Sequence, residues 1–394
     1  MIGRILTLLA LSCVVAVAQV KIERGDNLPA FPDPVGRAGM AAAAVRLADG
    51  SQGLLVVGGA NFPGRAPWDG GEKVFHADIV LLSKIDGAWT WTKVGDLPEP
   101  VAYAAFGPCK EGLVIAGGVN AEGHLAAVRV ITPEGRVSSR RPLPTTLAYA
   151  ACATDGDRLV VIGGQSTPTA TSAEPFFGLL DLSEPDARWL AKPWLANGRI
   201  LGTAGVLDGK LVLAGGCTLK SGPDGKPFRT YLSDTRVFKL DSDATDWESA
   251  SVAGPQLPFP VVAACGPAVA IGERLILIGA DDGSHYGKPP ANHPGQRGDI
   301  LVIDPDEGTV EIAGKIATGC VTTPAVQLGS DIVIVSGETK PGVRTAEMQV
   351  LRTTVSQGQG WVPTLSAALA AVVGVAALGW AIRRSRKTSG KAQP

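Results

Sequence analysis

The amino-acid sequence predicts an all-β protein whose strands form a six-bladed β-propeller. Three observations favour this class: apolar runs that end in glycine recur six times, the 394 residues include 50 glycines and 29 prolines, and only 5% of the residues are aromatic. Such a composition is typical of many short strands joined by tight turns. Because 45% of the residues are hydrophobic and only 19% are charged, the composition excludes a disordered chain.

The repeated unit is an apolar run followed by two small residues, usually a glycine pair. Successive pairs are 46 to 64 residues apart, which scatters about the roughly 50-residue period of kelch repeats. Four strands for each of six units make a six-bladed, kelch-type β-propeller. The six pairs are Gly58-Gly59, Gly117-Gly118, Gly163-Gly164 and Gly215-Gly216, with two degenerate copies at Gly279-Ala280 and Ser336-Gly337.

Other signals keep the same phase within each unit. A strand of small residues, such as 148–153, precedes the apolar run, and a strand such as 236–240 follows the variable loop after the glycine pair. The last unit is one strand short, because only residues 347–353 follow its variable loop. We expect residues 20–24 to supply the missing outer strand, which would join the two ends of the chain and remove an exposed sheet edge.

Residues 1–18 have the pattern of a secretory signal peptide. Arg4 provides the positive start, residues 5–17 the apolar core, and Ala16-Val17-Ala18 a small-residue cleavage site. The sequence therefore predicts that residues 19–355 form an exported propeller.

The other end of the chain has the pattern of a membrane anchor. After a polar spacer at 356–360, residues 361–382 form an uncharged, mostly apolar run of 22 residues, which is long enough to cross a bilayer as a helix. The basic tail 383–394 follows at once and predicts a cytoplasmic C-terminus. The propeller is accordingly expected outside the cytoplasm, in the periplasm or at the cell surface, and tethered to the membrane.

Charge and cysteine usage exclude several classes of function. The tail holds 5 basic and no acidic residues in a chain of formal net charge −1, so the body is mildly acidic and a nucleic-acid partner is not expected. No CxxC motif or Cys/His pairing suggests a metal site. After cleavage an odd number of cysteines remains, one in each of five units, and this predicts buried thiols instead of disulfides: Cys109, Cys152, Cys217, Cys265 and Cys320.

The stretch 336–345 carries the strongest chemical signal. Glu338 follows the end of a buried strand, and Pro341-Gly342 predicts a turn that swings Arg344 back toward the carboxylate. A carboxylate and a guanidinium on one loop can accept a proton and bind an anion. Taken alone, the ten residues are also compatible with an ordinary surface ion pair. The loop follows the sixth small-residue pair of the repeat, and this position favours a functional site over a surface ion pair.

In a propeller, the loops after the glycine pairs and the residues that lead into the innermost strands open on one face. Residues 281–298 form a long insert on that face, which is either a lid or a plain surface loop. The side chains expected to converge on the channel mouth follow the glycine pairs or lie at the entries to the innermost strands: Asn61, Asn120, Gln165, Cys217, Asp281, Asp282 and Glu338, and Arg37, Tyr103, Tyr149 and Arg199.

Two segments resemble one enzyme family. Residues 337–345, Gly-Glu-Thr-Lys-Pro-Gly-Val-Arg-Thr, resemble the Gly-Glu-Ala-Lys-Pro-Gly-Leu-Arg-Thr stretch of the N-acetylneuraminate epimerases, or sialic acid mutarotases. Residues 58–64 and 73–79 are similar to the first blade of the cyclically permuted branch of that family. The resemblance covers the propeller and places the Glu/Arg blade last in the chain.

The resemblance implies that Glu338 is the catalytic general base and that Arg344 is the catalytic group that orients the substrate. It implies an isomerase that needs neither cofactor nor metal, with a small acidic sugar as its substrate. Because a neighbouring arginine lowers the pKa of a carboxyl, burial must compensate if Glu338 is to be an effective base. Arg37 and Arg199 are further candidates to bind the sugar carboxylate.

Asn61 and His76 match the first-blade pattern of the permuted branch, and both are candidates for substrate binding. A loop histidine is also often a structural hydrogen-bonding residue, so two interpretations of His76 remain.

Two functions from different classes therefore follow from the sequence. The first is an extracytoplasmic mutarotase or epimerase that interconverts anomers of N-acetylneuraminate or a related acidic sugar. The second is a non-catalytic, membrane-tethered propeller that binds carbohydrate or protein and needs neither Glu338 nor Arg344. A copper-radical oxidase is disfavoured, because the chain has only four tyrosines and four histidines and they are scattered.

Overall fold

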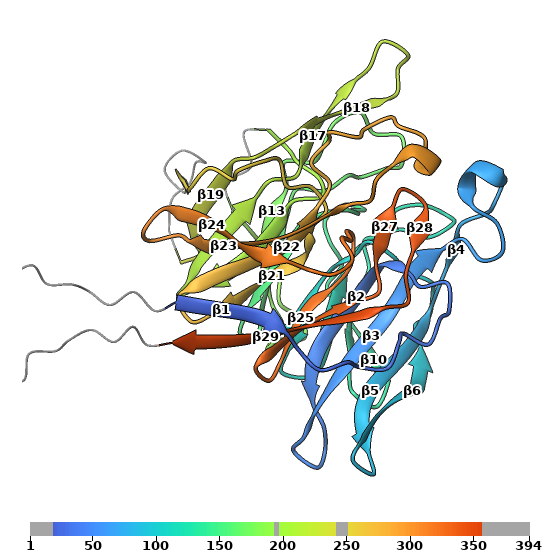
Figure 1. The fold of residues 1–394 in the computed structure, drawn as a ribbon, viewed down its shortest axis with the longest axis vertical. Coiled ribbons are helices and arrows are strands. Elements are labelled where there is room, and N and C mark those ends of the chain that lie inside the picture. Colours follow the sequence, from blue (N-terminus) through green and yellow to red (C-terminus); the bar gives the residue numbers. More distant parts are fainter. Residues whose placement is uncertain (1–18, 193–196, 242–250, 357–394) are drawn as a thin grey trace, which may run out of the picture. The chain divides into compact units, whose positions relative to one another are not determined.

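The structure is a computed structural model that describes residues 19–192, 197–241 and 251–356. Six antiparallel sheets, each built on a path of four strands, surround a common axis (Figure 1). The predicted all-β, six-bladed propeller is confirmed, and its blades form one compact unit, Val20–Thr354.

The predicted signal peptide (1–18), transmembrane helix (361–382) and basic tail (383–394) lie outside the described residues. Within the described ranges, no helix has the length and apolar character that a membrane span requires. The helices there are the short 3₁₀ turns η1 (Pro67–Asp69) and η2 (Pro290–Asn292).

Each blade runs from an innermost strand at the axis to an outer strand. Blade 1 contains β2 (Ala38–Arg46), β3 (Gln52–Asn61), β5 (Asp78–Ile85) and β6 (Ala88–Asp96), and the short β4 (Val74–Phe75) pairs with the end of β3. Blade 2 contains β7 (Ala105–Cys109), β8 (Gly112–Ala116), β9 (Val128–Ile131) and β10 (Val137–Arg140). Blade 3 contains β11 (Ala151–Asp155), β12 (Arg158–Ile162), β13 (Phe177–Asp181) and β14 (Leu190–Ala191).

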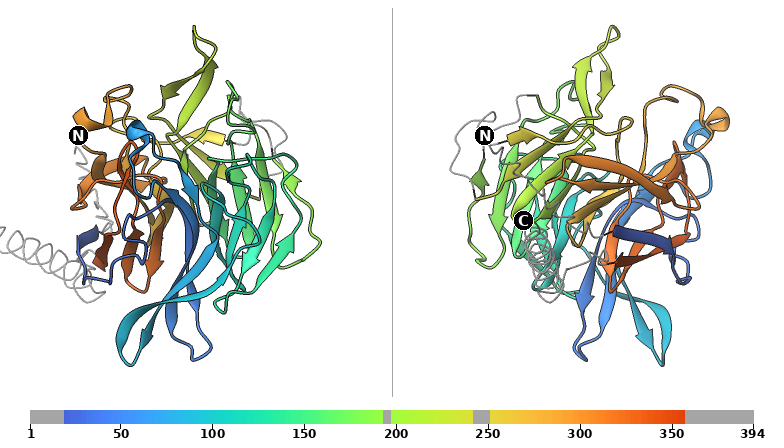
Figure 2. Two further views of the ribbon diagram at one scale, coloured as in Figure 1. Left: turned by 90° about the vertical axis from the view of Figure 1, so that its right-hand side faces the viewer. Right: turned by 60° about the vertical axis from the view of Figure 1, so that its left-hand side comes forward.

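The remaining blades follow the same pattern, and two of them carry an extra hairpin. Blade 4 contains β15 (Thr203–Leu207), β16 (Lys210–Ala214), β19 (Thr235–Lys239) and β20 (Ser251–Ala253), and its hairpin of β17 (Cys217–Ser221) and β18 (Pro227–Tyr231) stands away from the sheets (Figure 2). Blade 5 contains β21 (Cys265–Ile271), β22 (Arg274–Ala280), β23 (Arg297–Asp304) and β24 (Thr309–Lys315). Blade 6 contains β25 (Ala325–Leu328), β26 (Asp331–Val335) and β29 (Met348–Ser356), with a hairpin of β27 (Glu338–Lys340) and β28 (Val343–Arg344).

The propeller closes through its first strand. β1 (Gln19–Arg24) lies beside β29 and completes the order β1-β29-β26-β25 in blade 6 (Figure 1). The prediction that residues 20–24 supply the missing outer strand is confirmed. The last blade is therefore built from both ends of the described chain, and its outer edge is covered.

The glycine pairs bring neighbouring blades into contact. The amide of the second glycine donates to a carbonyl that leads into the next blade, as in Gly59 to Val101 and Gly164 to Arg199, both at 2.8 Å. The first glycine has a positive φ, and an added Cβ at Gly58 or Gly163 would lie 2.2 or 2.1 Å from the same carbonyl oxygen. Only glycine fits a backbone contact this close. The glycine pairs that repeat in the sequence therefore make the close backbone contacts between neighbouring blades.

A second set of contacts closes a ring around the axis. In each blade, one residue at the start of the innermost strand or two to three positions before it has a positive φ. Its amide donates to the carbonyl of its counterpart in the preceding blade at 2.6 to 3.1 Å. Six such hydrogen bonds form a complete circle. Its members, which we call the axial ring, are Gly39, Tyr103, Tyr149, Leu201, Ala263 and Thr322.

The five predicted thiols are free. Cys152, Cys217, Cys265 and Cys320 are buried, and Cys109 is half-buried. Burial raises the pKa of the Cys152 and Cys217 thiols to about 11, so both are protonated at neutral pH. The prediction of thiols instead of disulfides is confirmed for the described residues.

Replacement of Gly163 by alanine should destabilise the propeller much more than replacement of Gly156. Both glycines lie in blade 3 with positive φ, but a Cβ at Gly156 meets no atom within 4 Å, whereas a Cβ at Gly163 meets the Arg199 carbonyl. We expect Gly156→Ala to cost about 1 kcal/mol through backbone strain and Gly163→Ala about 3 kcal/mol through strain and overpacking. Urea unfolding of the two variants measures the difference, and equal losses would contradict this role of the glycine pair.

Candidate active site

A cavity of about 780 Å³ opens above the axial ring. Its lining combines charged and aromatic side chains. The ring residues form part of its floor, and blades 1, 4, 5 and 6 add side chains from loops and hairpins. Its principal side chains are Phe62, Trp68, Lys73, Tyr103, Tyr149, Arg229, Tyr231, Asp281, Tyr286, Glu338 and Arg344.

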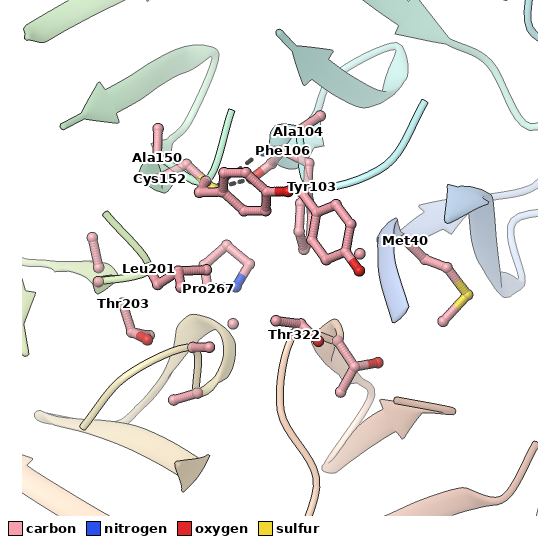
Figure 3. A pocket seen from close by; sticks show the side chains of 18 residues that line it. Met40, Tyr103, Ala104, Phe106, Ala150, Cys152, Leu201, Thr203, Pro267 and Thr322 are labelled. Atoms are coloured by element: carbon pink, nitrogen blue, oxygen red, sulfur yellow. Dashed lines mark hydrogen bonds between the residues drawn. The ribbon is translucent and has the colours of Figure 1, made fainter. Parts of the chain in front are cut away.

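A smaller chamber of about 90 Å³ lies in the axial channel. Figure 3 shows side chains from several blades around it, among them Met40, Phe106, Cys152 and Pro267. The five ring members with side chains line both spaces, so the axial ring is the partition between the large cavity and the channel. The rings of Tyr103 and Tyr149 have centroids 5.0 Å apart.

The predicted pair of Glu338 and Arg344 is present in the cavity. The two residues face each other across the β27–β28 hairpin, whose turn is Pro341-Gly342 with a positive φ at the glycine. Arg344 Nη2 lies 2.7 Å from Glu338 Oε2. The hairpin brings a carboxylate and a guanidinium together for the local reason predicted from the sequence.

Burial makes Glu338 a stronger base than an exposed glutamate. Its side chain is 18% exposed, and burial raises its pKa above the ordinary value of 4.5 in spite of the opposing charges of Arg344 and Lys73. The loss of hydration therefore outweighs the ion pair.

Arg344 has unused hydrogen-bonding capacity. Its side chain is 3% exposed, and its Nε and Nη1 atoms have no hydrogen-bond partner among the described residues. The guanidinium lies over the ring of Phe62, at 4.9 Å from the centroid. Buried donors without partners are costly unless a ligand satisfies them, so this group can accept an anion from the cavity.

A second polar cluster, with Tyr231 and Asp281, also lines the cavity. The hydroxyl of Tyr231 donates to Asp281 Oδ2 at 2.8 Å, and burial raises the pKa of Tyr231 further above that of a free tyrosine. Tyr286, from the insert at 281–298, packs edge-on against Tyr231 at 6.0 Å. Arg229 lines the same cavity. Thus the insert and the β17–β18 hairpin together shape the mouth.

The structure does not bring Arg37, Asn61 and His76 to the cavity. Arg37 is buried and pairs with Asp33 at 2.8 Å and Asp78 at 2.7 Å. Asn61 donates to Asp33 at 2.9 Å, and its Oδ1 lies 2.9 Å from His76 Nε2. Burial and the charge of Arg37 lower the pKa of His76. The three residues form a hydrogen-bonded network with Asp33 and Asp78 inside blade 1, so these internal partners already satisfy their polar groups.

Arg199 is likewise held by its own blade. Its guanidinium donates to both carboxylate oxygens of Asp234, at 3.2 and 3.1 Å, and to the carbonyl of Gly215 at 2.9 Å. It does not line the cavity. Arg37 contacts Asp78 and the carbonyl of Gly58 in the same manner. Both arginines therefore join the start of a blade to a glycine pair.

Several cavity residues escaped the sequence analysis. Lys73 lies in the first-blade motif, in which the resemblance implies substrate-binding roles for Asn61 and His76. Arg229 and Tyr231 lie on the hairpin of blade 4, whose signal is the Gly-Pro-Asp-Gly turn at 222–225 between polar, β-branched and aromatic residues. The described residues contain no group of three or more His, Cys, Asp or Glu side chains able to hold a metal ion.

Comparisons with known proteins support the resemblance found in the sequence. No protein-family model matches the chain. N-acetylneuraminate epimerase 1 of Escherichia coli O6:H1 is 35% identical over 107 residues, which are 25% of this chain and 26% of that protein. The solved structure of YjhT superimposes with a TM-score of 0.54 at 15% identity, covering 72% of this chain and 99% of that one.

The resemblance to the N-acetylneuraminate epimerases is confirmed. Two Adagio-like proteins of rice are also similar, at 30% identity over 155 residues (39% of this chain, 22% of that protein) and 25% over 284 residues (64% and 43%). The chain thus spans less than half the length of each of these curated relatives. The likeness to YjhT supports the propeller fold.

Removal of the Arg344 charge should make the stability of the protein depend strongly on pH. In Arg344→Met, Glu338 loses a charge that lowers its pKa, so its folded-state pKa rises further above the unfolded value. A raised carboxyl pKa gives stability at low pH that is lost as the pH rises through it. We expect a loss of about 3 kcal/mol at pH 8 and a smaller one at pH 5, measured by urea unfolding.

The control is Arg352→Met, which removes an exposed pair with Asp26 and Asp331 and should cost less than about 1 kcal/mol. A loss for Arg344→Met that is identical at both pH values would show that Glu338 does not depend on Arg344.

Proposed function

We propose that this propeller is a mutarotase or epimerase that interconverts the anomers of N-acetylneuraminate or a related acidic sugar. The observation that carries the proposal is the pair of Glu338 and Arg344 in one open cavity: a basic carboxylate beside a guanidinium whose Nε and Nη1 have no hydrogen-bond partner among the described residues. The similarity to N-acetylneuraminate epimerase 1 supports the same chemistry.

Anomer exchange requires a proton to leave the anomeric hydroxyl while the ring oxygen gains one. Glu338 would take the proton from the hydroxyl, and the bond between the anomeric carbon and the ring oxygen would break. The open sugar then rotates about the carbon–carbon bond that joined the anomeric carbon to the rest of the ring, and it recloses on the other face of the carbonyl. The free Nε and Nη1 of Arg344 would donate charge-assisted hydrogen bonds to the anionic substrate.

The location forms part of the proposal. The apolar segment at 1–18 and the run at 361–382 support export of residues 19–355 and a membrane tether with a cytoplasmic tail. The cyclically permuted order of the blades, with Glu338 in the last and Asn61 in the first, likewise remains a prediction.

Proton NMR of freshly released α-N-acetylneuraminate tests the activity. The wild-type protein should speed the approach to the β-anomer, whereas Glu338→Gln, which keeps the size of the side chain and loses the base, should be slower by about 10²-fold or more. If the protein binds the sugar and neither form accelerates the exchange, the non-catalytic binding propeller is the correct function. Equal rates with and without protein, and no binding, would exclude this sugar.

The dependence of kcat/KM on pH tests the state of Glu338. Because the ionised carboxylate is the active form and burial raises its pKa above 4.5, the rate should fall as the pH decreases, with an inflection above that value. An inflection at or below 4.5 would show that the ion pair, and not burial, dominates.

A further inference from the structure

Ring opening needs a proton donor as well as a base, and this inference rests on the proposed function. Arg344 cannot be the donor, because a guanidinium does not lose its proton in proteins. Glu338 is occupied as the base. A second titratable group must therefore face the same part of the cavity.

Most titratable groups of the cavity are unsuited to this role. Burial raises the pKa of Tyr103 and Tyr149, so their protons are held too firmly at neutral pH. The proton of Tyr231 is already donated to Asp281. His293 is buried, and burial lowers its pKa, so it is uncharged at neutral pH.

Lys73 has the required position. It directly precedes β4, which pairs with the end of β3 through Asn61 and Val74, so its backbone is fixed to blade 1. Its Nζ lies 5.7 Å from the ring centroid of Phe62 and 5.4 Å from that of Tyr103. The Phe62 ring also contacts the guanidinium of Arg344 at 4.9 Å. Lys73 and Arg344 therefore both lie over the ring of Phe62, and Arg344 pairs with Glu338.

The ammonium of Lys73 is also free to act. In the part of the chain that the structure describes, it contacts aromatic rings and no carboxylate lies within ion-pair distance. The charged and titratable groups that face it are Arg344, Glu338 and Tyr103. Two cations beside one carboxylate leave this corner with a positive charge, which suits an acidic sugar.

We propose that Lys73 is the general acid that protonates the ring oxygen of the substrate. In the forward step Glu338 takes the proton of the anomeric hydroxyl, the bond from the anomeric carbon to the ring oxygen breaks, and the ring oxygen takes a proton from the Lys73 ammonium. In the reverse step the new hydroxyl returns that proton to Lys73 as the ring closes on the other face. Glu338 then gives its proton to the new anomeric oxygen, so both residues are restored.

The directions of the pKa shifts of Lys73 and Glu338 agree with these roles. Lys73 is solvent-exposed as a residue, but partial desolvation of its ammonium and the charge of Arg344 lower its pKa, against the opposing effect of Glu338. Burial raises the pKa of Glu338. Environments that move an acid and a base toward neutral pH are typical of catalytic pairs. Lysine is suited to this function because its pKa responds to burial, whereas arginine keeps its charge.

The test compares Lys73→Arg and Lys73→Met with wild type in the anomer-exchange assay, over a range of pH. The Arg variant keeps the positive charge and removes the titratable proton. We expect kcat to fall by about 10²-fold or more in both variants, with KM within about threefold of wild type for Lys73→Arg. The alkaline decrease of kcat, which reports loss of the Lys73 proton, should be absent from the residual activity of Lys73→Arg.

Lys84→Met is the matched control, because Lys84 also lies over an aromatic ring, Trp89 at 5.3 Å, and is remote from the cavity lining. It should behave as wild type. A Lys73→Arg variant with near-normal kcat would show that charge alone matters and would overturn the proton-donor role. An active wild type with an equally active Lys73→Met would overturn the Lys73 role alone, whereas an inactive wild type would overturn the proposed function and this role together.

Discussion

The axial ring is the constraint on which the propeller and its cavity depend. Six backbone amides each donate to the preceding blade at 2.6 to 3.1 Å, so no blade can shift without breaking the circle. A left-handed conformation costs a residue other than glycine about 1–2 kcal/mol, and five of the six members bear that cost. Contacts with the blades on both sides must therefore hold them in place. The same conformation lets the side chains of these five residues line both the cavity and the channel, so they separate the two spaces.

This arrangement explains what could be predicted from the sequence and what could not. The glycine pairs are visible because only glycine tolerates a carbonyl oxygen about 2 Å from its missing Cβ, as at Gly58 and Gly163. The axial ring is hidden, because its backbone geometry is shared by six members of five residue types. The pairing of Glu338 with Arg344 was predictable because a local turn produces it. The positions of Arg37 and Arg199 were not, since aspartates from elsewhere in the same blade bind them first.

The buried arginines Arg37 and Arg199 differ from Arg344 in which groups accept their hydrogen bonds. Arg37 and Arg199 are buried, and carboxylates and carbonyls of their own blades take up most of their donors. Arg344 is equally buried, but two of its nitrogen atoms have no partner in the described chain. A buried charge with unmet donors lowers stability unless something else binds it. In the proposed function a substrate anion would be that partner, so the local instability and the proposed binding site would have one cause.

The location of the site at the closure of the chain follows from the same contacts. Glu338 and Arg344 belong to blade 6, while Phe62 and Lys73 belong to blade 1. These two blades meet where the amide of Gly337 donates to the carbonyl of Arg37 at 3.0 Å and where Ser336 Oγ accepts the Arg37 amide at 2.8 Å. Blade 6 is itself complete only when β1 pairs with β29. Glu338, Arg344 and Lys73, the proposed base, anion-binding group and acid, therefore come together only in a closed ring. The joined ends of the propeller are thus a condition for the candidate site and not only for stability.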